Sequence, residues 1–306
     1  MLHFLYCFDK NYNKQAFTSI FSLLQAVDNK ITIHIISNQD QDNILIPNKI
    51  KFHDNLSQFY FYKIQLTNLN LYNLKEAHVT EATFYRLFLE DYIEIDDYIT
   101  YLDCDIICLS NPLNQINNLI EKLELENKMV AFNTEIKKSE EDSIFKNLDL
   151  KGENYFNAGV MVFNSKKWRQ KNIKFSSINL IKKLKNKAIF WDQDILNVIF
   201  DKEYYELPNE LNCRIQNNNN TIPVFYHFAG KFKPWSINGA FQKYGFEFHS
   251  LYRQIYKQKY LITTSNTTNG LNHLKSRFKS RDIQFNLEGI TFLFYSLKAI
   301  LRKTIK

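Results

Sequence analysis

Two apolar segments separated by an amphipathic one open the chain, and this alternation narrows the folds available to it. LHFLYCF (2–8) and ITIHII (31–36) have the length and composition of buried strands, and residues 14–27 repeat apolar side chains at helical spacing. A strand–helix–strand unit folds with its strands parallel, so the sequence predicts an α/β protein whose ligand site lies at the carboxyl ends of the strands. Asp9 and Asn11 directly follow the first strand and fall at that edge.

The same alternation continues to about residue 235. Glycine and proline are scarce, at 7 and 5 residues in 306, so no stretch is typical of a linker. The sequence therefore predicts one α/β domain over 1–250 and a basic helical tail over 251–306. The other expected elements are helices over 80–95, 114–128 and 176–187, and strands over 101–109, 129–132, 156–164 and 224–228.

Targeting, membrane-spanning and zinc signatures are not found in the sequence. The start MLHFLYCFDK has no basic segment before its apolar stretch, so no signal peptide is expected. No apolar run approaches the roughly 20 residues that span a bilayer. Cys7, Cys104, Cys108 and Cys213 lack the paired spacing of zinc ligands, and three of them lie in strand-like runs, where a reduced thiol packs as a small hydrophobe. A reducing cytoplasm is the expected location.

The net charge of +7 is concentrated in the tail. Residues 251–306 contain 11 lysines and arginines against 2 acids, which leaves residues 1–250 at −2. Because the basic charge is confined to the tail and no RNA-binding signature is found, no nucleic-acid partner is expected. Residues 286–306 fit an amphipathic helix with Lys298, Arg302 and Lys306 beside its apolar face. Such a helix suits an anionic membrane surface, and the alternative is a helix docked on the domain.

Two aspartates interrupt the apolar segment YLDCDIICL (101–109). Side chains alternate along a strand, so Asp103 and Asp105 are expected on the same side with Cys104 opposite. Neighbouring carboxylates repel each other unless one is protonated or a cation lies between them. Oxygen ligands suit Mn²⁺ or Mg²⁺, which also bind diphosphate oxygens. The alternative is a strand end whose acids face water.

A second polar group follows the apolar strand VFYHF (224–228). His227 is a plausible third metal ligand, and an imidazole would select Mn²⁺ over Mg²⁺. Gly230 lets the backbone approach a phosphate closely, and Lys233 supplies a mobile positive charge. A metal, a glycine and a lysine together describe a clamp for a diphosphate.

Six stretches in order resemble glycosyltransferase family 8, and most of all its bacterial lipopolysaccharide and lipooligosaccharide galactosyl- and glucosyltransferases. The resemblance covers about residues 1–236. The stretches are FDKNY (8–12), TFYRLFLEDYI (83–93), YLDCDIICLSNPL (101–113), YFNAGVMVFNSKKWR (155–169), DQDILN (192–197) and HFAGKFKPW (227–235).

The resemblance implies a nucleotide-diphosphosugar transferase fold of the GT-A type, with a mixed, mainly parallel sheet. It also implies transfer of a hexose from a UDP-sugar with retention of anomeric configuration, and Mn²⁺, or alternatively Mg²⁺, held by Asp103, Asp105 and His227. The residues it assigns to uridine and diphosphate are Cys7 (through its backbone), Asp9, Asn11, Gly230 and Lys233. Those it assigns to the donor sugar are Arg86, Asn157, Asp192 and Gln193.

Several of these residues have a structural alternative. Arg86 is equally typical of a charge on a helix surface, and Asp192 occupies a position typical of a helix N-cap. Asn157 and Gly159 are also residues that shape the entry to a strand. The order of the motifs favours function for all assigned residues but Asn11.

Retention raises the question of the nucleophile. Double displacement needs a carboxylate, but the residue that the family places beneath the sugar is Gln193, a poor nucleophile. Front-face attack by the acceptor hydroxyl is therefore favoured, with Asp192 as a covalent nucleophile the competing hypothesis. Where relatives carry an acidic sugar contact this chain has FNTEIKK, so Asn133, Thr134 and Glu135 all stay candidates, and the donor hexose stays open between glucose and galactose.

The expected acceptor is a cell-surface glycolipid or oligosaccharide such as the lipopolysaccharide or lipooligosaccharide core. The expected location is the inner face of the bacterial cytoplasmic membrane. Transfer to a capsular or protein-linked glycan is an alternative, as is a non-catalytic relative that binds a UDP-sugar or glycan. The intact set of Asp103, Asp105 and His227 argues against a non-catalytic protein.

Overall fold

The computed structural model describes most of the chain up to residue 257. The polar loop over 216–221 and most of the helix predicted over 286–306 lie outside the described residues. The helix α8 (Gly245–Tyr256) runs across the boundary predicted at residue 250, and the division into domain and tail stays a prediction. The described residues are 1–66, 80–215 (without the side chain of Asn186), 222–230, 233–236, 243–257, 293, 294 and 297.

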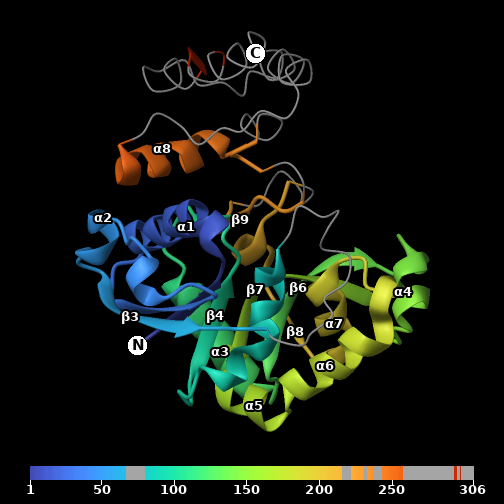
Figure 1. Ribbon diagram of the computed structural model, residues 1–306. Helices are drawn as coiled ribbons and strands as arrows, with labels where there is room; N and C mark the ends of the chain where they lie inside the picture. The colour runs from blue at the N-terminus through green and yellow to red at the C-terminus, as the bar shows by residue number, and fades with distance from the viewer. Residues whose placement is uncertain are drawn as a thin grey trace.

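Seven strands form a central sheet that runs through the body of the molecule (Figure 1), in the order β3-β2-β1-β4-β7-β6-β8. β7 is antiparallel to both of its neighbours, and the other pairs are parallel. The sheet is therefore mixed and mainly parallel, which confirms the predicted fold class. Its strands are β1 (His3–Cys7), β2 (Ile31–Ser37), β3 (Leu56–Lys63), β4 (Tyr98–Leu102), β6 (Val130–Lys137), β7 (Asn154–Asn164) and β8 (Tyr205–Glu206).

Helices cover both faces of this sheet. One face packs against α1 (Asn13–Ala26), α2 (Asn48–Lys51) and α3 (Leu113–Leu125), and α8 lies across α1 and α2 (Figure 1). The other face packs against a 3₁₀ helix, η3, and four α-helices. These are η3 (Glu81–Asp91), α4 (Asp142–Leu148), α5 (Ser165–Gln170), α6 (Ile173–Leu184) and α7 (Trp191–Ile199).

Strand alternation explains why the sheet has a core on each side. In β1, Leu5 packs on the η3 side while Phe4 and Tyr6 pack on the α1 side, and none of the three is exposed. Burying a large apolar side chain in this way contributes about 1.5–3 kcal/mol. A parallel strand covered on both faces must be apolar throughout, which is why LHFLYCF has no polar alternation.

The segment YLDCDIICL is not one strand, and this prediction was wrong. β4 ends at Leu102, and β5 (Ile106–Cys108) pairs antiparallel with β9 (Phe225–His227) in a separate two-stranded sheet. Because β5 leaves the large sheet to reach β9, the chain must turn between the two strands. Asp103 and Asp105 lie in that turn, so their shared direction does not come from strand alternation.

The other predicted elements are present with shifted ends. The helix expected over 80–95 is the 3₁₀ helix η3, whose apolar residues Phe84, Leu87 and Phe88 are spaced to suit either helix type. The helix expected over 114–128 ends at Leu125, and the one expected over 176–187 begins at Ile173 and gives way to a 3₁₀ turn at Lys185.

All four cysteines are buried and none is in a disulfide. Burial raises the pKa of the Cys7 and Cys108 thiols well above the ordinary value. The thiols are therefore protonated and pack as small apolar groups, as predicted from their strand-like surroundings.

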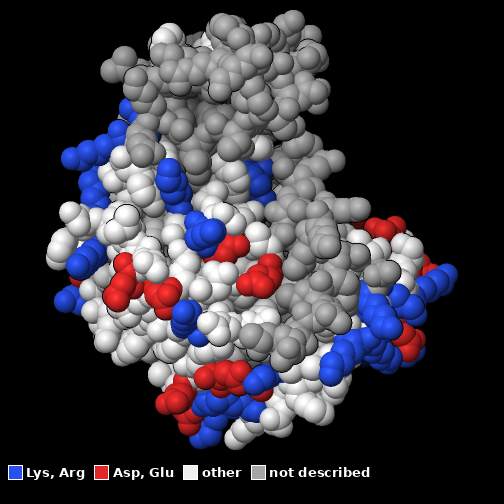
Figure 2. Space-filling view, in the orientation of Figure 1, with Lys and Arg blue, Asp and Glu red and all other residues white. Residues whose placement is uncertain are grey.

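Acidic and basic side chains alternate over the face seen in Figure 2. Lysines gather over α4 and α6, where the exposed Lys151, Lys183 and Lys187 lie near Asp149. The described part of this face carries no continuous basic field. Among the described helices, none is long and apolar enough to cross a bilayer.

Candidate active site

A cavity of about 1310 Å³ lies beside the carboxyl ends of β1 and β4, the edge where the sequence predicts a ligand. Every predicted site residue lines it except Asp9 and Asn11. The buried Asp9 instead accepts a hydrogen bond through Oδ1 from the Asn11 N–H at 2.8 Å, and so caps the 3₁₀ turn η1 (Lys10–Tyr12).

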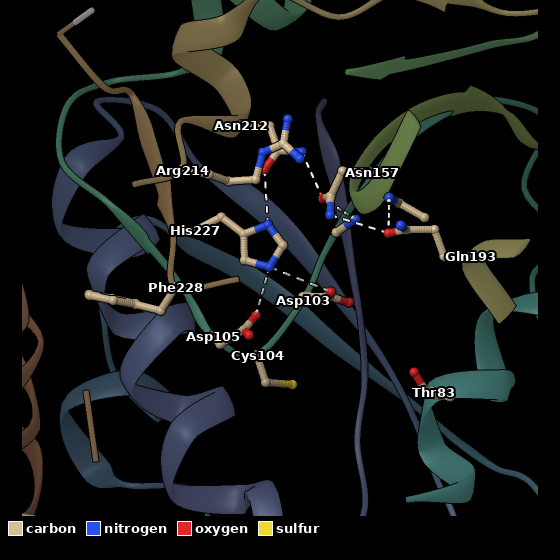
Figure 3. A network of polar contacts seen from close by, with 12 residues as sticks. Thr83, Asp103, Cys104, Asp105, Asn157, Gln193, Asn212, Arg214, His227 and Phe228 are labelled. Atoms are coloured by element: carbon tan, nitrogen blue, oxygen red, sulfur yellow. Dashed lines mark hydrogen bonds and ion pairs between the residues drawn. The ribbon is translucent and has the colours of Figure 1, made fainter. Parts of the chain in front are cut away.

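The three predicted metal ligands meet on one side of this cavity (Figure 3). One ligand atom from each of Asp103, Asp105 and His227 lies within 4.8 Å of the others. His227 Nε2 is 3.3 Å from Asp105 Oδ1 and 3.9 Å from Asp103 Oδ2. Asp105 Oδ1 is buried and accepts no hydrogen bond within the described part of the chain. Two carboxylates and an imidazole around one point are a donor set that fits a divalent cation.

A chain of amides behind the His227 ring sets its tautomer (Figure 3). The Gly159 N–H donates to Asn157 Oδ1 at 3.0 Å, and Asn212 Nδ2 donates to the same oxygen at 3.0 Å. Because a backbone N–H can only donate, Asn157 presents its oxygen here and Asn212 its amino group. Asn212 Oδ1 therefore accepts the proton of His227 Nδ1 at 3.0 Å. This leaves the lone pair of Nε2 directed at the two aspartates.

Gly159 makes room for the imidazole. A Cβ atom added there would lie 2.2 Å from His227 Cε1 and 3.0 Å from Asp103 Oδ2, closer than real Cβ contacts allow. The strand is irregular at this point, because the pairing of β6 with β7 shifts register between Ala131 and Asn133. The sequence suggested only that Gly159 shapes a strand entry, whereas its bare Cα lets His227 approach the aspartates.

Lys233 contacts Asp105 from another side. Its Nζ forms an ion pair with Asp105 Oδ2 and donates to the Phe228 carbonyl oxygen at 2.9 Å. Burial alone would raise the pKa of Asp105, but the ammonium group of Lys233 holds it well below the usual range. Asp105 is therefore ionised at neutral pH, as a metal ligand must be.

Arg86 joins the aspartate turn to α7. Its Nη1 donates to Asp103 Oδ1 at 3.0 Å and to the Ala158 carbonyl oxygen at 2.6 Å, and its Nε pairs with Asp192 Oδ2. Burial favours the neutral form, but the two aspartates raise the pKa of Arg86 well above its usual value. Arg86 is 4% exposed, so the alternative of a helix-surface charge does not hold.

Asp192 does not cap α7. The helix follows Phe190, and Asp192 lies within its first turn, 2% exposed. One of its oxygens accepts from Thr83 Oγ1 at 3.0 Å and the other pairs with Arg86. Both oxygens are thus bound to cavity-lining side chains rather than to helix N–H groups.

Four hydrogen bonds fix the carboxamide of Gln193. Its Oε1 accepts from the Ala158 N–H at 3.1 Å and from Asn157 Nδ2 at 3.2 Å. Its Nε2 donates to Glu135 Oε2 at 3.0 Å and to the Tyr155 hydroxyl at 3.2 Å. Behind it, Tyr155 donates to Asp194 at 2.5 Å, and burial raises the pKa of Asp194 to about 6.

Two aromatic rings and a glycine with a left-handed backbone also line the cavity. The rings of Tyr12 and Trp235 lie edge to face, 6.1 Å apart, near Cys7 at the end of β1. Gly230 has a φ of +76°, a left-handed conformation that favours glycine, and a Cβ added there would meet nothing within 4 Å.

The comparisons with known proteins agree with this geometry. A model of glycosyl transferase family 8 matches residues 3–239. The chain belongs to glycosyltransferase family 8. This family 8 enzyme is 31% identical over 253 residues to a lipopolysaccharide 1,2-glucosyltransferase of Escherichia coli, covering 74% of this chain and 71% of that protein. It is 26% identical over 266 residues to general stress protein A of Bacillus subtilis (strain 168), covering 78% of this chain and 88% of that one.

Its fold is similar to that of the galactosyltransferase LgtC, whose crystal structure holds donor and acceptor sugar analogs. The TM-score is 0.73 at 21% identity, with 83% of this chain and 96% of that chain covered. At this identity the likeness bears on the fold, and it supports the GT-A type architecture. The predicted family and the predicted enzyme class, a glycosyltransferase, are confirmed.

Several cavity residues of this family 8 glycosyltransferase were not assigned from the sequence. Of the three candidates left open in FNTEIKK, only Glu135 reaches Gln193; Asn133 is buried against Leu207 and Asn209, and Thr134 bonds Glu206. Thr134 and Ile136 also line the cavity, and the pairing of β6 with β7 shifts register between them, so strand alternation could not have singled out Glu135. Tyr12 and Arg214 also line the cavity and were not assigned a role from the sequence. Tyr155 and Asn212, which were not assigned either, bond to the cavity-lining Gln193 and Asn157.

Proposed function

We propose that this chain is a retaining glycosyltransferase that moves glucose or galactose from a UDP-sugar to a lipopolysaccharide or lipooligosaccharide core. The observation that carries the proposal is the meeting of Asp103, Asp105 and His227 beside a cavity of about 1310 Å³. The similarity to a lipopolysaccharide 1,2-glucosyltransferase and to a galactosyltransferase supports the choice of hexose and acceptor.

Asp103, Asp105 and His227 would hold Mn²⁺, with Mg²⁺ as the alternative. Bound there, the cation would act as a Lewis acid that offsets the charge growing on the leaving diphosphate. The orphaned Asp105 Oδ1 and the Nε2 lone pair of His227 both point into this position and support the assignment.

Gly230 and Lys233 would bind the diphosphate, the first by backbone approach and the second by charge. The base would lie near Cys7, where Tyr12 and Trp235 supply aromatic surface. Asp9 and Asn11 lie just behind this position and would support the turn that carries Tyr12.

The donor sugar would rest against Arg86, Asn157, Asp192 and Gln193, all of which line the cavity. Gln193 would face the anomeric carbon as that carbon gains positive character, and the acceptor hydroxyl would attack from the side of the leaving group. The two bonds that Asp192 makes, to Thr83 and Arg86, support a positioning role over a covalent one. On this account the departing phosphate takes the acceptor proton.

We also propose that residues 286–306 bind an anionic membrane surface, from the basic and apolar stripes in their sequence. This places the enzyme at the inner face of the cytoplasmic membrane, where a lipid-anchored acceptor is met. Removal of residues 286–306 should abolish sedimentation with vesicles that contain anionic lipid. Unchanged sedimentation of the shortened chain would refute the membrane proposal and leave the transferase proposal intact.

Calorimetric titration of UDP tests the proposed function, with and without Mn²⁺, on the wild type and on Asp103→Asn. We expect UDP to bind tightly only with Mn²⁺, and Asp103→Asn to lose that dependence. Asp40→Asn is a matched control, because Asp40 pairs with Lys63 at the exposed surface. Equal binding with and without the metal would overturn the proposed metal-dependent transferase. Absence of binding would overturn it as well, together with the alternative of a non-catalytic protein that binds a UDP-sugar.

A further inference from the structure

A nearly buried arginine lies behind Glu135. Arg214 is 3% exposed and follows the 3₁₀ turn η5 (Asn209–Asn212). Its Nη2 donates to Asn133 Oδ1 at 2.8 Å and to the Thr134 carbonyl oxygen at 3.0 Å, and its Nη1 is 2.7 Å from Glu135 Oε1. The guanidinium therefore holds the end of β6 and the carboxylate that β6 presents to the cavity.

The other oxygen of the same carboxylate reaches the donor-sugar side. Glu135 Oε2 accepts from Gln193 Nε2 at 3.0 Å and from Asn157 Nδ2 at 3.3 Å. One carboxylate thus connects Arg214, which does not belong to any of the quoted family motifs, to the amide proposed to face the anomeric carbon.

Two neighbours of the Gln193 amide, one that can only donate a hydrogen bond and one that can only accept, fix its orientation. The Ala158 N–H can only donate, so it must meet the Gln193 oxygen; an ionised carboxylate can only accept, so Glu135 must meet the nitrogen. A glutamine at position 135 could donate as well as accept. It would therefore no longer require the Gln193 nitrogen to face it, and only the Ala158 N–H would still select the Gln193 oxygen.

We propose that Arg214 is a positioning residue for sugar transfer: through Glu135 it fixes the orientation of the Gln193 carboxamide. This inference rests on the proposed function. The two-nitrogen fork matters as much as the charge, because one nitrogen holds β6 while the other holds the carboxylate. A lysine supplies the charge at one point only.

A purely structural brace is the rival explanation, since Arg214 also bonds Asn133 and Thr134. Arg169 provides a matched control for that role. Its Nη1 donates to the carbonyl oxygens of Ile93 and Ile95 at 2.7 and 3.2 Å, and it pairs with Asp96, but it does not line the cavity.

The test is a double-mutant cycle on the full chain with Arg214→Met, Glu135→Gln and both together. Release of UDP from UDP-glucose and UDP-galactose is measured with Mn²⁺ and without acceptor, alongside UDP affinity and Tm. We expect each single variant to lower kcat by about tenfold or more, a difference of about 1.4 kcal/mol, with UDP affinity unchanged. The double variant should be no slower than the slower single one, and Arg214→Lys should restore kcat only in part.

Arg169→Met should lower Tm and leave kcat unchanged. If Arg214→Met does not fold, Arg214→Lys takes its place in the cycle. Additive losses of kcat in the double variant, or a kcat in the Arg214 variant equal to that of the wild type, would overturn the inference. A wild type that neither binds UDP nor releases it from either sugar nucleotide would instead overturn the proposed function.

Discussion

His227 Nδ1 and Asn212 Oδ1 lie 3.0 Å apart, with the histidine donating and the amide accepting. The direction of this bond is imposed from the far end of the amide chain, by the backbone N–H of Gly159. A main-chain group of β7 therefore decides which nitrogen of His227 faces Asp103 and Asp105. Partners of this kind orient metal-binding histidines in other proteins.

Replacing Asn212 should therefore weaken cation binding without touching a proposed ligand. We expect Asn212→Leu to lower the Mn²⁺ affinity by about 10- to 100-fold, because the ring loses the acceptor that fixes its tautomer. A Mn²⁺ titration measures the loss, and ¹⁵N shifts of His227 report the tautomer. Asn55→Leu is the control. The side-chain amide of Asn55 donates to the carbonyl oxygens of Leu24 and Val27, and Asn55 does not line the cavity. Equal affinity and an unchanged tautomer in Asn212→Leu would contradict this role.

Gly159→Ala should remove the cation site altogether. The added methyl would lie 2.2 Å from His227 Cε1, so the imidazole must move away from the aspartates. Gly152→Ala is a matched control, because its methyl would lie 2.5 Å from Asp201 Oδ1, outside the cavity. Both variants should lower Tm, and only Gly159→Ala should lose Mn²⁺ binding in calorimetry. Retained binding in Gly159→Ala would show that the ring position is unimportant.

Gln193→Ala tests the proposed front-face attack. We expect kcat for UDP release to fall by about a hundredfold but not to zero, because an electrostatic contact is lost and no covalent step is removed. Mass spectrometry of the intact protein during turnover supplies the second readout. Complete loss of activity together with a hexose adduct on Asp192 would establish a covalent route instead.

Acidification should destabilise the fold through His34. Burial, and to a smaller extent His3, lowers the pKa of this fully buried histidine to about 4, while the unfolded value is near 6.5. The neutral ring is favoured in the folded state, so this contribution is complete above pH 6.5 and is lost as the pH falls toward 4. The expected loss in the free energy of unfolding is about 2 kcal/mol at pH 5.

Urea unfolding at pH 7 and pH 5 measures that change. The difference between the two pH values should shrink in His34→Gln, which keeps polar atoms for its neighbours His3 and Tyr62 but does not titrate in this range. An equal difference in the variant and the wild type would assign the acid sensitivity to other groups, such as the buried His249, whose pKa burial also lowers to about 4.

The fold class could be predicted from the sequence because each buried strand is recognisable from its own run of apolar residues. β1 and β2 are apolar throughout and are separated by an amphipathic helix, which specifies a parallel pair with no further information. The break between β4 and β5 could not be predicted in the same way. It depends on pairing with β9, more than a hundred residues later, and strand partners at that distance leave no local pattern.

The same distinction holds for the candidate site. Asp103, Asp105 and His227 were assigned because they belong to short motifs whose order resembles one family. Asn212 and Arg214 were not, because each acts through a hydrogen bond to a residue from a distant strand. The sequence around a loop asparagine or arginine does not show whether its side chain bonds to a distant strand or to solvent.

The two-stranded sheet of β5 and β9 pairs only three residues on each side, and it carries His227 to the aspartate turn. A short ladder between distant segments is entropically costly to close. A cation held by Asp103, Asp105 and His227 would act as a cross-link over that ladder, so Mn²⁺ should raise the thermal stability of this part of the fold in particular. Because His227 is synthesised long after Asp103, the central sheet up to β7 can begin to assemble while the proposed cation site is still incomplete.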